Sequence, residues 1–214
     1  MKVFVSWSGG KESAMATYRA ISQDYQVSYL VNFISENGER SRSHGIKAEV
    51  LRMQSEAIGI PMVQVRTSWG NYEENFKKVV ENLKEEGIEG GIFGDIEVEE
   101  HREWVERVCA ELGVKACLPL WGCEPEELIA DFWALGFKSV IVATRLDEKL
   151  LGRDLDRAFL TEIQKFNCHP CGESGEYHTF VTGGNVSNGS LKVVQGKREK
   201  RDNVWFLELS AEFE

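Results

Sequence analysis

The sequence predicts an α/β protein with a parallel, doubly wound sheet, followed by a smaller C-terminal α/β region. Two observations support this prediction. Over residues 3–118, short runs of β-forming residues alternate with amphipathic segments of helical length, which is typical of a parallel sheet with helices on both faces. After residue 122, a helix, a strand and a second helix are followed by three strand-like segments. We therefore expect one unit at residues 1–122 and another at 123–214.

The first unit alternates strands and helices throughout. Val3, Phe4 and Val5 predict a strand, and a segment rich in helix formers follows at residues 14–21. By the same reasoning, we expect strands at residues 26–34, 62–65, 90–95 and 114–118, and helices at residues 47–58, 73–86 and 99–112. In such a sheet, ligands bind beyond the carboxyl ends of the strands. The polar segments that fall there are residues 8–13, 35–45 and 95 onward.

The second unit has a different pattern. The elements expected in it are helices at residues 124–135 and 156–166, and strands at residues 139–143, 178–182, 191–195 and 203–209. Glycine and asparagine turns separate the last strands. The basic run Lys197–Arg201 lies between two of these strands, and we interpret it as a solvated hairpin loop.

Composition and charge exclude several classes of protein. The formal net charge of −10 opposes attraction to nucleic acid or to anionic membranes, so we expect neither as a partner. The first residues run directly into a strand, and the longest apolar runs fall far short of a membrane span of roughly 20 residues, which predicts a cytoplasmic protein. Five cysteines favour reduced thiols over a disulfide framework. The oligomeric state stays open, with a homo-oligomer among the alternatives.

A glycine turn connects the first strand to the first helix. Gly9 and Gly10 can adopt backbone angles that are closed to other residues, so that successive N–H groups converge on an anion in front of a helix N-terminus. Lys11 would add a full positive charge as a solvent-facing loop cation. The spacing matches neither a Walker A loop nor a dinucleotide fingerprint, and an ordinary Gly-Gly turn with a capping serine stays open as the alternative. The candidate phosphate ligands are Ser6, Ser8, Gly9, Gly10, Lys11 and Ser13.

A second group of reactive side chains lies in the other unit. Glu173 and Glu176 enclose a glycine-containing turn before a strand, which suits a loop that presents carboxylates to a cation, an amine or a Mg²⁺-bound phosphate. A solvated turn would have the same pattern. Cys168 and Cys171 have the spacing of half a zinc site, but the chain has no second C-x-x-C pair. We therefore predict that no metal binds these cysteines.

Four motifs in the same order resemble those of a known family. Residues 8–13, SGGKES, resemble the SGGKDS loop of the PP-loop ATP pyrophosphatases, with Glu12 where that family usually has aspartate. Together with GDIEVEEHREWVE at residues 94–106, LLGRDLD at 150–156 and CGESGEYHT at 171–179, this loop makes the chain similar to the diphthine–ammonia ligases, a branch of those enzymes. The resemblance covers nearly the whole chain.

This resemblance implies a fold and an activity. Residues 1–122 would form an adenine-nucleotide α-hydrolase-like (PP-loop) ATP-binding domain, and residues 123–214 a family-specific domain that carries the GESGE motif. The implied reaction is the ATP-dependent amidation of diphthine on elongation factor 2 with ammonium, through an acyl-adenylate, with release of AMP and pyrophosphate. ATP and Mg²⁺ are the implied cofactors, and elongation factor 2 and ammonium are the implied partners.

The resemblance also implies roles for individual residues. His44 would lie near the adenosine, with a surface histidine as the alternative, and Asp95 would bind Mg²⁺ or position substrate, with a helix N-terminal charge as the alternative. His101 and Arg102 share the Asp95 motif, although an exposed helix face explains them equally well. Because the glycine loop and the motif glutamates fall in different units, we expect changes in the glutamates to leave ATP binding intact. The implied catalytic residues are Lys11, Glu173 and Glu176.

Two other functions stay open at this point. A tRNA-modifying PP-loop enzyme would activate a base oxygen with ATP, although the acidic charge of the chain opposes tRNA binding. A non-catalytic ATP-binding sensor would have the same fold, but it would have no need of paired motif glutamates.

Overall fold

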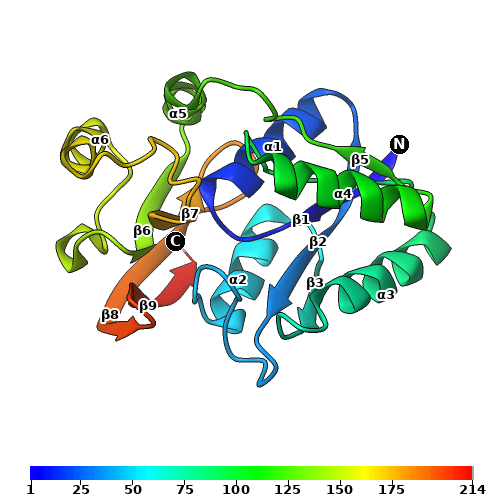
Figure 1. Ribbon diagram of the computed structural model, residues 1–214, viewed down its shortest axis with the longest axis horizontal. Coiled ribbons are helices and arrows are strands. Elements are labelled where there is room, and N and C mark those ends of the chain that lie inside the picture. The colour runs from blue at the N-terminus through cyan, green and yellow to red at the C-terminus, as the bar shows by residue number, and fades with distance from the viewer. Residues whose placement is uncertain (214) are drawn as a thin grey trace.

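The first half of the chain forms a five-stranded parallel sheet with the strand order β3-β2-β1-β4-β5. The computed structural model describes residues 1–213 (Figure 1). The predicted parallel α/β fold is therefore confirmed. The strands are β1 (Lys2–Ser6), β2 (Gln26–Ile34), β3 (Met62–Arg66), β4 (Gly90–Ile92) and β5 (Lys115–Cys117).

Helices cover both faces of this sheet, as predicted. Successive residues of β1 point to opposite faces: Val3 and Val5 pack into the core beneath α1 and α2, whereas Phe4 packs into the core beneath α3 and α4. The carboxyl ends of the strands are therefore held between two apolar layers. The helices are α1 (Lys11–Ser22), α2 (Ala48–Ile58), α3 (Tyr72–Glu85) and α4 (Glu99–Leu112).

The second half forms a four-stranded antiparallel sheet with the strand order β7-β6-β9-β8. In Figure 1 this sheet lies at the left, and α3 and α4 lie at the right. Its strands are β6 (Lys138–Thr144), β7 (Tyr177–Gly183), β8 (Leu191–Arg201) and β9 (Val204–Phe213). The helical segments of this half are α5 (Pro125–Ala134), η1 (Glu148–Leu150), α6 (Arg157–Ile163) and η2 (Gln164–Phe166).

Three expected elements differ from the structure. The basic run Lys197–Arg201 is not a hairpin loop, because it belongs to β8 and pairs with β9. The turn lies after it, at Asp202 and Asn203, which have φ angles of 47° and 65°. Charged side chains are tolerated on β8 because it is an edge strand, where they oppose pairing with other chains.

The helix expected at residues 156–166 changes to a 3₁₀ turn after Ile163, and β4 ends at Ile92 rather than at residue 95.

One continuous core joins the two sheets. Met15 of α1 and Leu51 of α2 belong to the same buried cluster as Phe132 of α5 and Phe180 of β7. Strand β7 therefore lies close to the start of α1, and this contact builds the site described below. Within residues 1–213, no helix is long and apolar enough to cross a membrane.

Candidate active site

The glycine loop between β1 and α1 is tightly enclosed. Gly9 has a φ angle of 86°, and a Cβ atom added there would lie 2.6 Å from Leu51 Cδ2. A Cβ atom added to Gly10 would lie 2.6 Å from His44 Cε1. Both positions therefore require glycine, the first for its backbone conformation and the second for space.

The serines of this loop hold its shape. The Gly10 N–H donates to Ser8 Oγ over 3.2 Å, and Ser13 Oγ donates to the Gly10 carbonyl over 3.0 Å. Helix α1 starts with Gly10 as its N-cap and without a side-chain cap, so the alternative of a simple capping serine is wrong. The side chains of Ser6, Ser8 and Ser13 line a cavity of about 250 Å³ in front of this helix end.

Strand β7 completes the glycine loop. The Val181 N–H donates to the Gly9 carbonyl over 2.9 Å, and the Lys11 N–H donates to Thr179 Oγ1 over 3.0 Å. The Gln54 side-chain amide connects the same two segments, because its Nε2 donates to the Gly9 and Val181 carbonyls over 3.1 and 2.7 Å. The glycine loop and the segment that carries the GESGE motif thus lie at one site. We had placed these two segments in separate units, and for that reason we expected glutamate variants to leave ATP binding intact. The contacts between them contradict this separation.

Lys11 does not face solvent, contrary to the prediction. Its side chain is 4% exposed, and its Nζ donates to the Cys171 carbonyl over 2.6 Å. The same ammonium forms an ion pair with Glu12 and lies 4.8 Å from the centre of the Tyr177 ring. Burial lowers the pKa of Lys11, but the Glu12 carboxylate, Tyr177 and Cys171 together raise it by more, so the pKa lies above its usual value and the ammonium stays charged. No local pattern indicates this contact, because its two partners lie 160 positions apart.

The two motif glutamates have different surroundings. Glu173 lines the 250 Å³ cavity, and burial, together with the nearby Glu12 carboxylate, raises its pKa to about 7. The Glu176 carboxylate instead accepts a hydrogen bond from the His169 N–H over 3.2 Å, and Glu176 is not among the residues that line this cavity. Glu173 is therefore placed to contact a ligand, whereas Glu176 supports the loop.

Asp95 and His101 meet at the edge of the same cavity. His101 Nδ1 lies 3.2 Å from Asp95 Oδ1, and this hydrogen bond raises the pKa of His101. Arg102 does not line the cavity. Its guanidinium contacts Glu106 and lies over the Trp121 ring. Arg102 thus lies on the exposed helix face, whereas His101 lines the cavity and is also largely exposed.

His44 is buried beside the glycine loop, so the alternative of a surface histidine is wrong. It is 7% exposed, its Nδ1 lies 3.0 Å from the Thr179 carbonyl oxygen, and its ring stacks on His178 with 4.5 Å between the ring centres. Burial lowers the pKa of His44 to about 4 and also lowers that of His178. Both rings are therefore neutral at pH 7.

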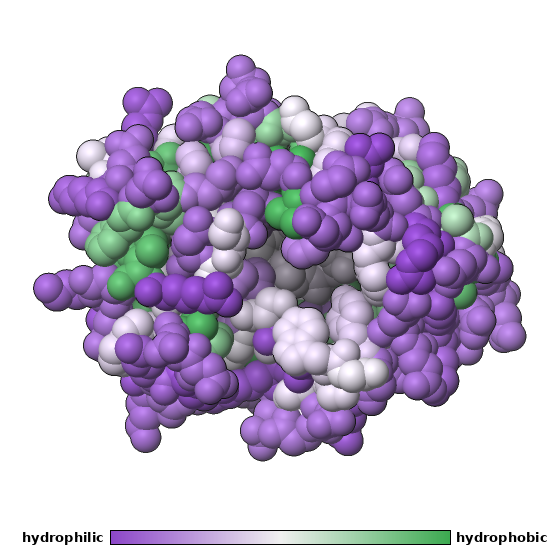
Figure 2. Space-filling model, in the orientation of Figure 1, coloured by the Kyte–Doolittle hydropathy of each residue, from purple (hydrophilic) through white to green (hydrophobic). Residues whose placement is uncertain are grey.

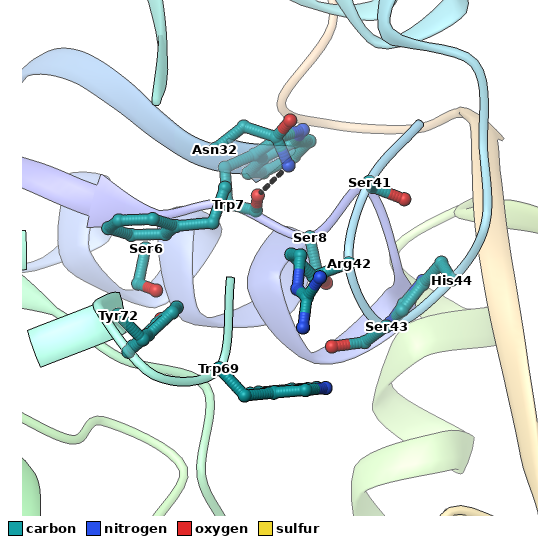
Figure 3. A pocket seen from close by; sticks show the side chains of 11 residues that line it. Ser6, Trp7, Ser8, Asn32, Ser41, Arg42, Ser43, His44, Trp69 and Tyr72 are labelled. Atoms are coloured by element: carbon teal, nitrogen blue, oxygen red, sulfur yellow. Dashed lines mark hydrogen bonds between the residues drawn. The ribbon is translucent and has the colours of Figure 1, made fainter. Parts of the chain in front are cut away.

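A smaller cavity of about 150 Å³ adjoins the first and shares Ser6, Ser8, Ser43 and His44 with it (Figure 3). The Arg42 guanidinium covers one side of it and lies 4.4 Å from the centre of the Trp69 ring. Our sequence analysis missed Trp69 and Tyr72, which also line this cavity. An aromatic pair directly after β3, at the carboxyl end of the sheet, was the signal that would have identified them.

A wide groove opens from these cavities to the surface. It has a volume of about 950 Å³ and shares Ser43, His101, Glu173 and His178 with the 250 Å³ cavity. Figure 2 shows that this face is hollowed near its middle and that mainly hydrophilic residues surround the hollow. A large substrate thus has a direct route to Glu173.

The cysteine pair lies at the border of the site, where Cys171 lines the 250 Å³ cavity and Cys168 does not. Cys171 is 2% exposed, and burial raises the pKa of its thiol to about 12. Burial raises the pKa of Cys168 to about 12 as well. Both thiols are therefore protonated at neutral pH.

Comparison with known proteins identifies the family. The sequence model described as the diphthamide synthase N-terminal domain matches residues 1–116, and the model of the diphthamide synthase C-terminal domain matches residues 124–211. Proteins named diphthine–ammonia ligase from Rattus norvegicus and Homo sapiens are each 28% identical to this chain over 85% of its length and 78% of theirs. A protein of the same name from Schizosaccharomyces pombe is 28% identical over 85% of this chain, which spans only 34% of that longer protein. The chain belongs to the diphthamide synthase family.

Proposed function

We propose that this chain is an ATP-dependent diphthine–ammonia ligase, which converts the diphthine carboxyl group on elongation factor 2 to an amide. The observation that carries the proposal is the 250 Å³ cavity that the glycine loop lines together with one further segment of the chain, represented by Cys171, Gly172, Glu173, Tyr177 and His178. A phosphate-binding loop and an acidic loop at one cavity suit a reaction in which ATP activates a carboxylate and an amine then attacks it. The membership of the diphthamide synthase family supports this substrate.

ATP would lie across the two adjoining cavities. The triphosphate would occupy the 250 Å³ cavity, with the hydroxyls of Ser6, Ser8 and Ser13 and the N-terminus of α1 directed at its oxygens. The adenosine would occupy the 150 Å³ cavity, where Trp69 offers an aromatic face and the neutral His44 adds no charge.

The site also suits Mg²⁺ that arrives with ATP. Asp95 lines the triphosphate cavity and has a carboxylate, the type of ligand that Mg²⁺ takes together with phosphate oxygens and water. When bound, the ion would neutralise part of the charge that develops on the leaving pyrophosphate.

The chemistry needs no nucleophile from the protein. A carboxylate is a poor acceptor for ammonia because oxide would be the leaving group. Attack by the diphthine carboxylate on the α-phosphorus of ATP gives an acyl-adenylate and releases pyrophosphate, whose charge the hydroxyls of the glycine loop would stabilise. Ammonia then attacks the acyl carbon, and AMP leaves with its bonding electron pair.

Glu173 is the residue to which we assign ammonium. It lines both the triphosphate cavity and the wide groove, so its carboxylate lies between the two substrates. A pKa of about 7 makes it an effective proton acceptor near neutral pH. Glu176, which binds the His169 N–H, would hold this loop in place.

The decisive experiment is reconstitution of the reaction. Purified protein with MgATP, ammonium and diphthine-bearing elongation factor 2 should produce diphthamide, detected by mass spectrometry, with one AMP and one pyrophosphate per amide. Production of ADP and phosphate would contradict the proposal. Steeply salt-dependent binding of tRNA would favour a tRNA-modifying enzyme, and ATP binding without AMP formation would favour a sensor.

A further inference from the structure

The Lys11 ammonium contacts three protein groups. A lysine ammonium has three donors and no acceptor. Lys11 Nζ contacts the Cys171 carbonyl at 2.6 Å, the Glu12 carboxylate, and the face of the Tyr177 ring at 4.8 Å from its centre. A phosphate oxygen would have to displace one of these partners to bind this ammonium.

The charge of Lys11 is also compensated. The Glu12 carboxylate pairs with it, and both side chains are largely buried, with exposed fractions of 5% and 19%. An ion pair of this kind presents less net charge to a phosphate than an unpaired ammonium would. The resting structure therefore assigns Lys11 a different task from the loop hydroxyls.

The partners of Lys11 lie at the two ends of the acidic loop. Cys171 precedes residues 172–176 and Tyr177 follows them. The Tyr177 hydroxyl closes the same loop by donating to the Pro170 carbonyl. The Lys11 side chain thus contacts both ends of the segment that carries Glu173. The Lys11 backbone N–H donates to Thr179 Oγ1 on β7.

We propose that Lys11 is a positioning residue that fixes the 171–177 loop against the glycine loop, and so sets the place of Glu173 relative to ATP. This inference rests on the proposed function for its kinetic readout, but its structural readout does not need activity. It predicts that the loss of Lys11 loosens the acidic loop and impairs the ammonium step more than ATP binding.

The test compares the full-length wild type with Lys11→Met, without nucleotide, by hydrogen–deuterium exchange. Amides in residues 172–177 should exchange about tenfold faster in the variant, the effect of losing one hydrogen bond from a charged donor. The KM for ammonium should rise, while the Kd for MgATP stays within about threefold of the wild type, because the loop hydroxyls remain.

Three further variants make the result specific. In Lys11→Met alone, the buried Glu12 carboxylate loses its cationic partner. The double variant Lys11→Met/Glu12→Gln removes that unpaired charge as well, so any remaining change in loop exchange reflects the loss of positioning. Lys11→Arg keeps a cationic donor and should restore part of the exchange protection. Lys78→Met is the matched control, because Lys78 forms an exposed ion pair with Glu74 far from the site, and its exchange and kinetics should equal those of the wild type.

The outcomes separate the two roles of Lys11. Unchanged exchange at residues 172–177 in both Met variants would overturn the inference. A loss of MgATP affinity of more than about tenfold with the loop still protected would overturn it as well, and would make Lys11 a phosphate ligand. If the wild type makes no amide, the proposed function fails, yet the exchange measurement still decides whether Lys11 positions the loop.

Discussion

The two faces of the parallel sheet are built differently. Under α3 and α4 the core is apolar and aromatic, with Phe4, Phe76 and Phe93 in mutual ring contact, and the charges lie outside on exposed helix surfaces. Under α1 and α2, where the second sheet docks, the core also contains buried polar side chains. Among them are Lys11, His44, Gln54 and Thr179, which are at most 7% exposed.

This difference separates stability from function. Burying a polar group costs free energy unless it is hydrogen-bonded, so a face that serves only as a core has no reason to include one. The polar groups on the α1/α2 face connect the glycine loop with β7 and the acidic loop. Four predictions test whether function is confined to that face.

The largest effect is expected from two buried phenylalanines, one on each face. Phe76 is 1% exposed on the α3 side, and Phe180 is 0% exposed on β7. Truncation of either to alanine should lower the free energy of unfolding by about 3–5 kcal/mol, measured by chemical denaturation. Only Phe180→Ala should reduce kcat/KM per folded molecule, because Phe180 packs near Gly9. An equal loss of activity in Phe76→Ala would contradict the view that function is confined to the α1/α2 face.

The next effect concerns the glycine loop itself. Gly10→Ala would place a methyl group 2.6 Å from His44 and 3.2 Å from the Thr179 carbonyl, so the loop has to shift. We expect AMP formation to fall about 100-fold, which is the usual result of a displacement near 1 Å at a reacting centre. Gly189→Ala is the control, since an added Cβ meets no atom of residues 1–213 within 4 Å. Equal activity of both variants would contradict the assigned phosphate site.

A smaller effect should appear in the pH dependence of Glu173. Burial raises its pKa from 4.5 to about 7, so between these values the folded protein binds a proton that the unfolded chain has released. The stability of the wild type should therefore fall as the pH rises from about 4.5 to about 7, and Glu173→Gln should remove this fall. Thermal denaturation at several pH values measures it.

The same titration bears on catalysis. Ionised Glu173 attracts ammonium, so the KM for ammonium in the wild type should decrease as the pH rises through about 7. The Glu173→Gln variant should show no such dependence. If the stability and the ammonium KM of Glu173→Gln follow the wild-type pH curves, Glu173 does not bind ammonium.

The smallest effect is expected on the outer surface of α3 and α4. Arg107 forms ion pairs with Glu73 and Glu111, both of which are solvent-exposed, and water weakens such pairs. Arg107→Ala should change neither activity nor the free energy of unfolding beyond experimental error. A clear loss of activity would show that function extends to this face.

Local patterns predicted the parallel sheet well. The nearly continuous apolar run at residues 26–34 gave β2 with its observed bounds, because a strand buried on both faces needs such a run. The prediction for the basic run Lys197–Arg201 was wrong. Charged residues indicate solvent exposure, but an exposed edge strand can carry them as well as a loop can. The sequence indicated which residues to consider for the site, but not how their side chains lie relative to one another.

What the sequence could not provide were contacts between distant segments. Glu173 and Glu176 have equivalent places in the motif, yet only Glu173 lines the cavity, because the His169 N–H binds the other carboxylate. Lys11 follows two loop glycines and was expected in solvent, because nothing near it in sequence indicates that the Cys171 carbonyl will approach it. Such contacts depend on how the two sheets pack.

The hydrogen bond from Val181 to Gly9 also has a consequence for the order in which the protein is made. A ribosome synthesises the glycine loop about 170 residues before the strand that completes it. Until β7 has been synthesised, the Gly9 carbonyl and the Lys11 backbone N–H lack the partners that this strand supplies. A nascent chain that ends before β7 therefore has the residues of the glycine loop but not the contacts that close it.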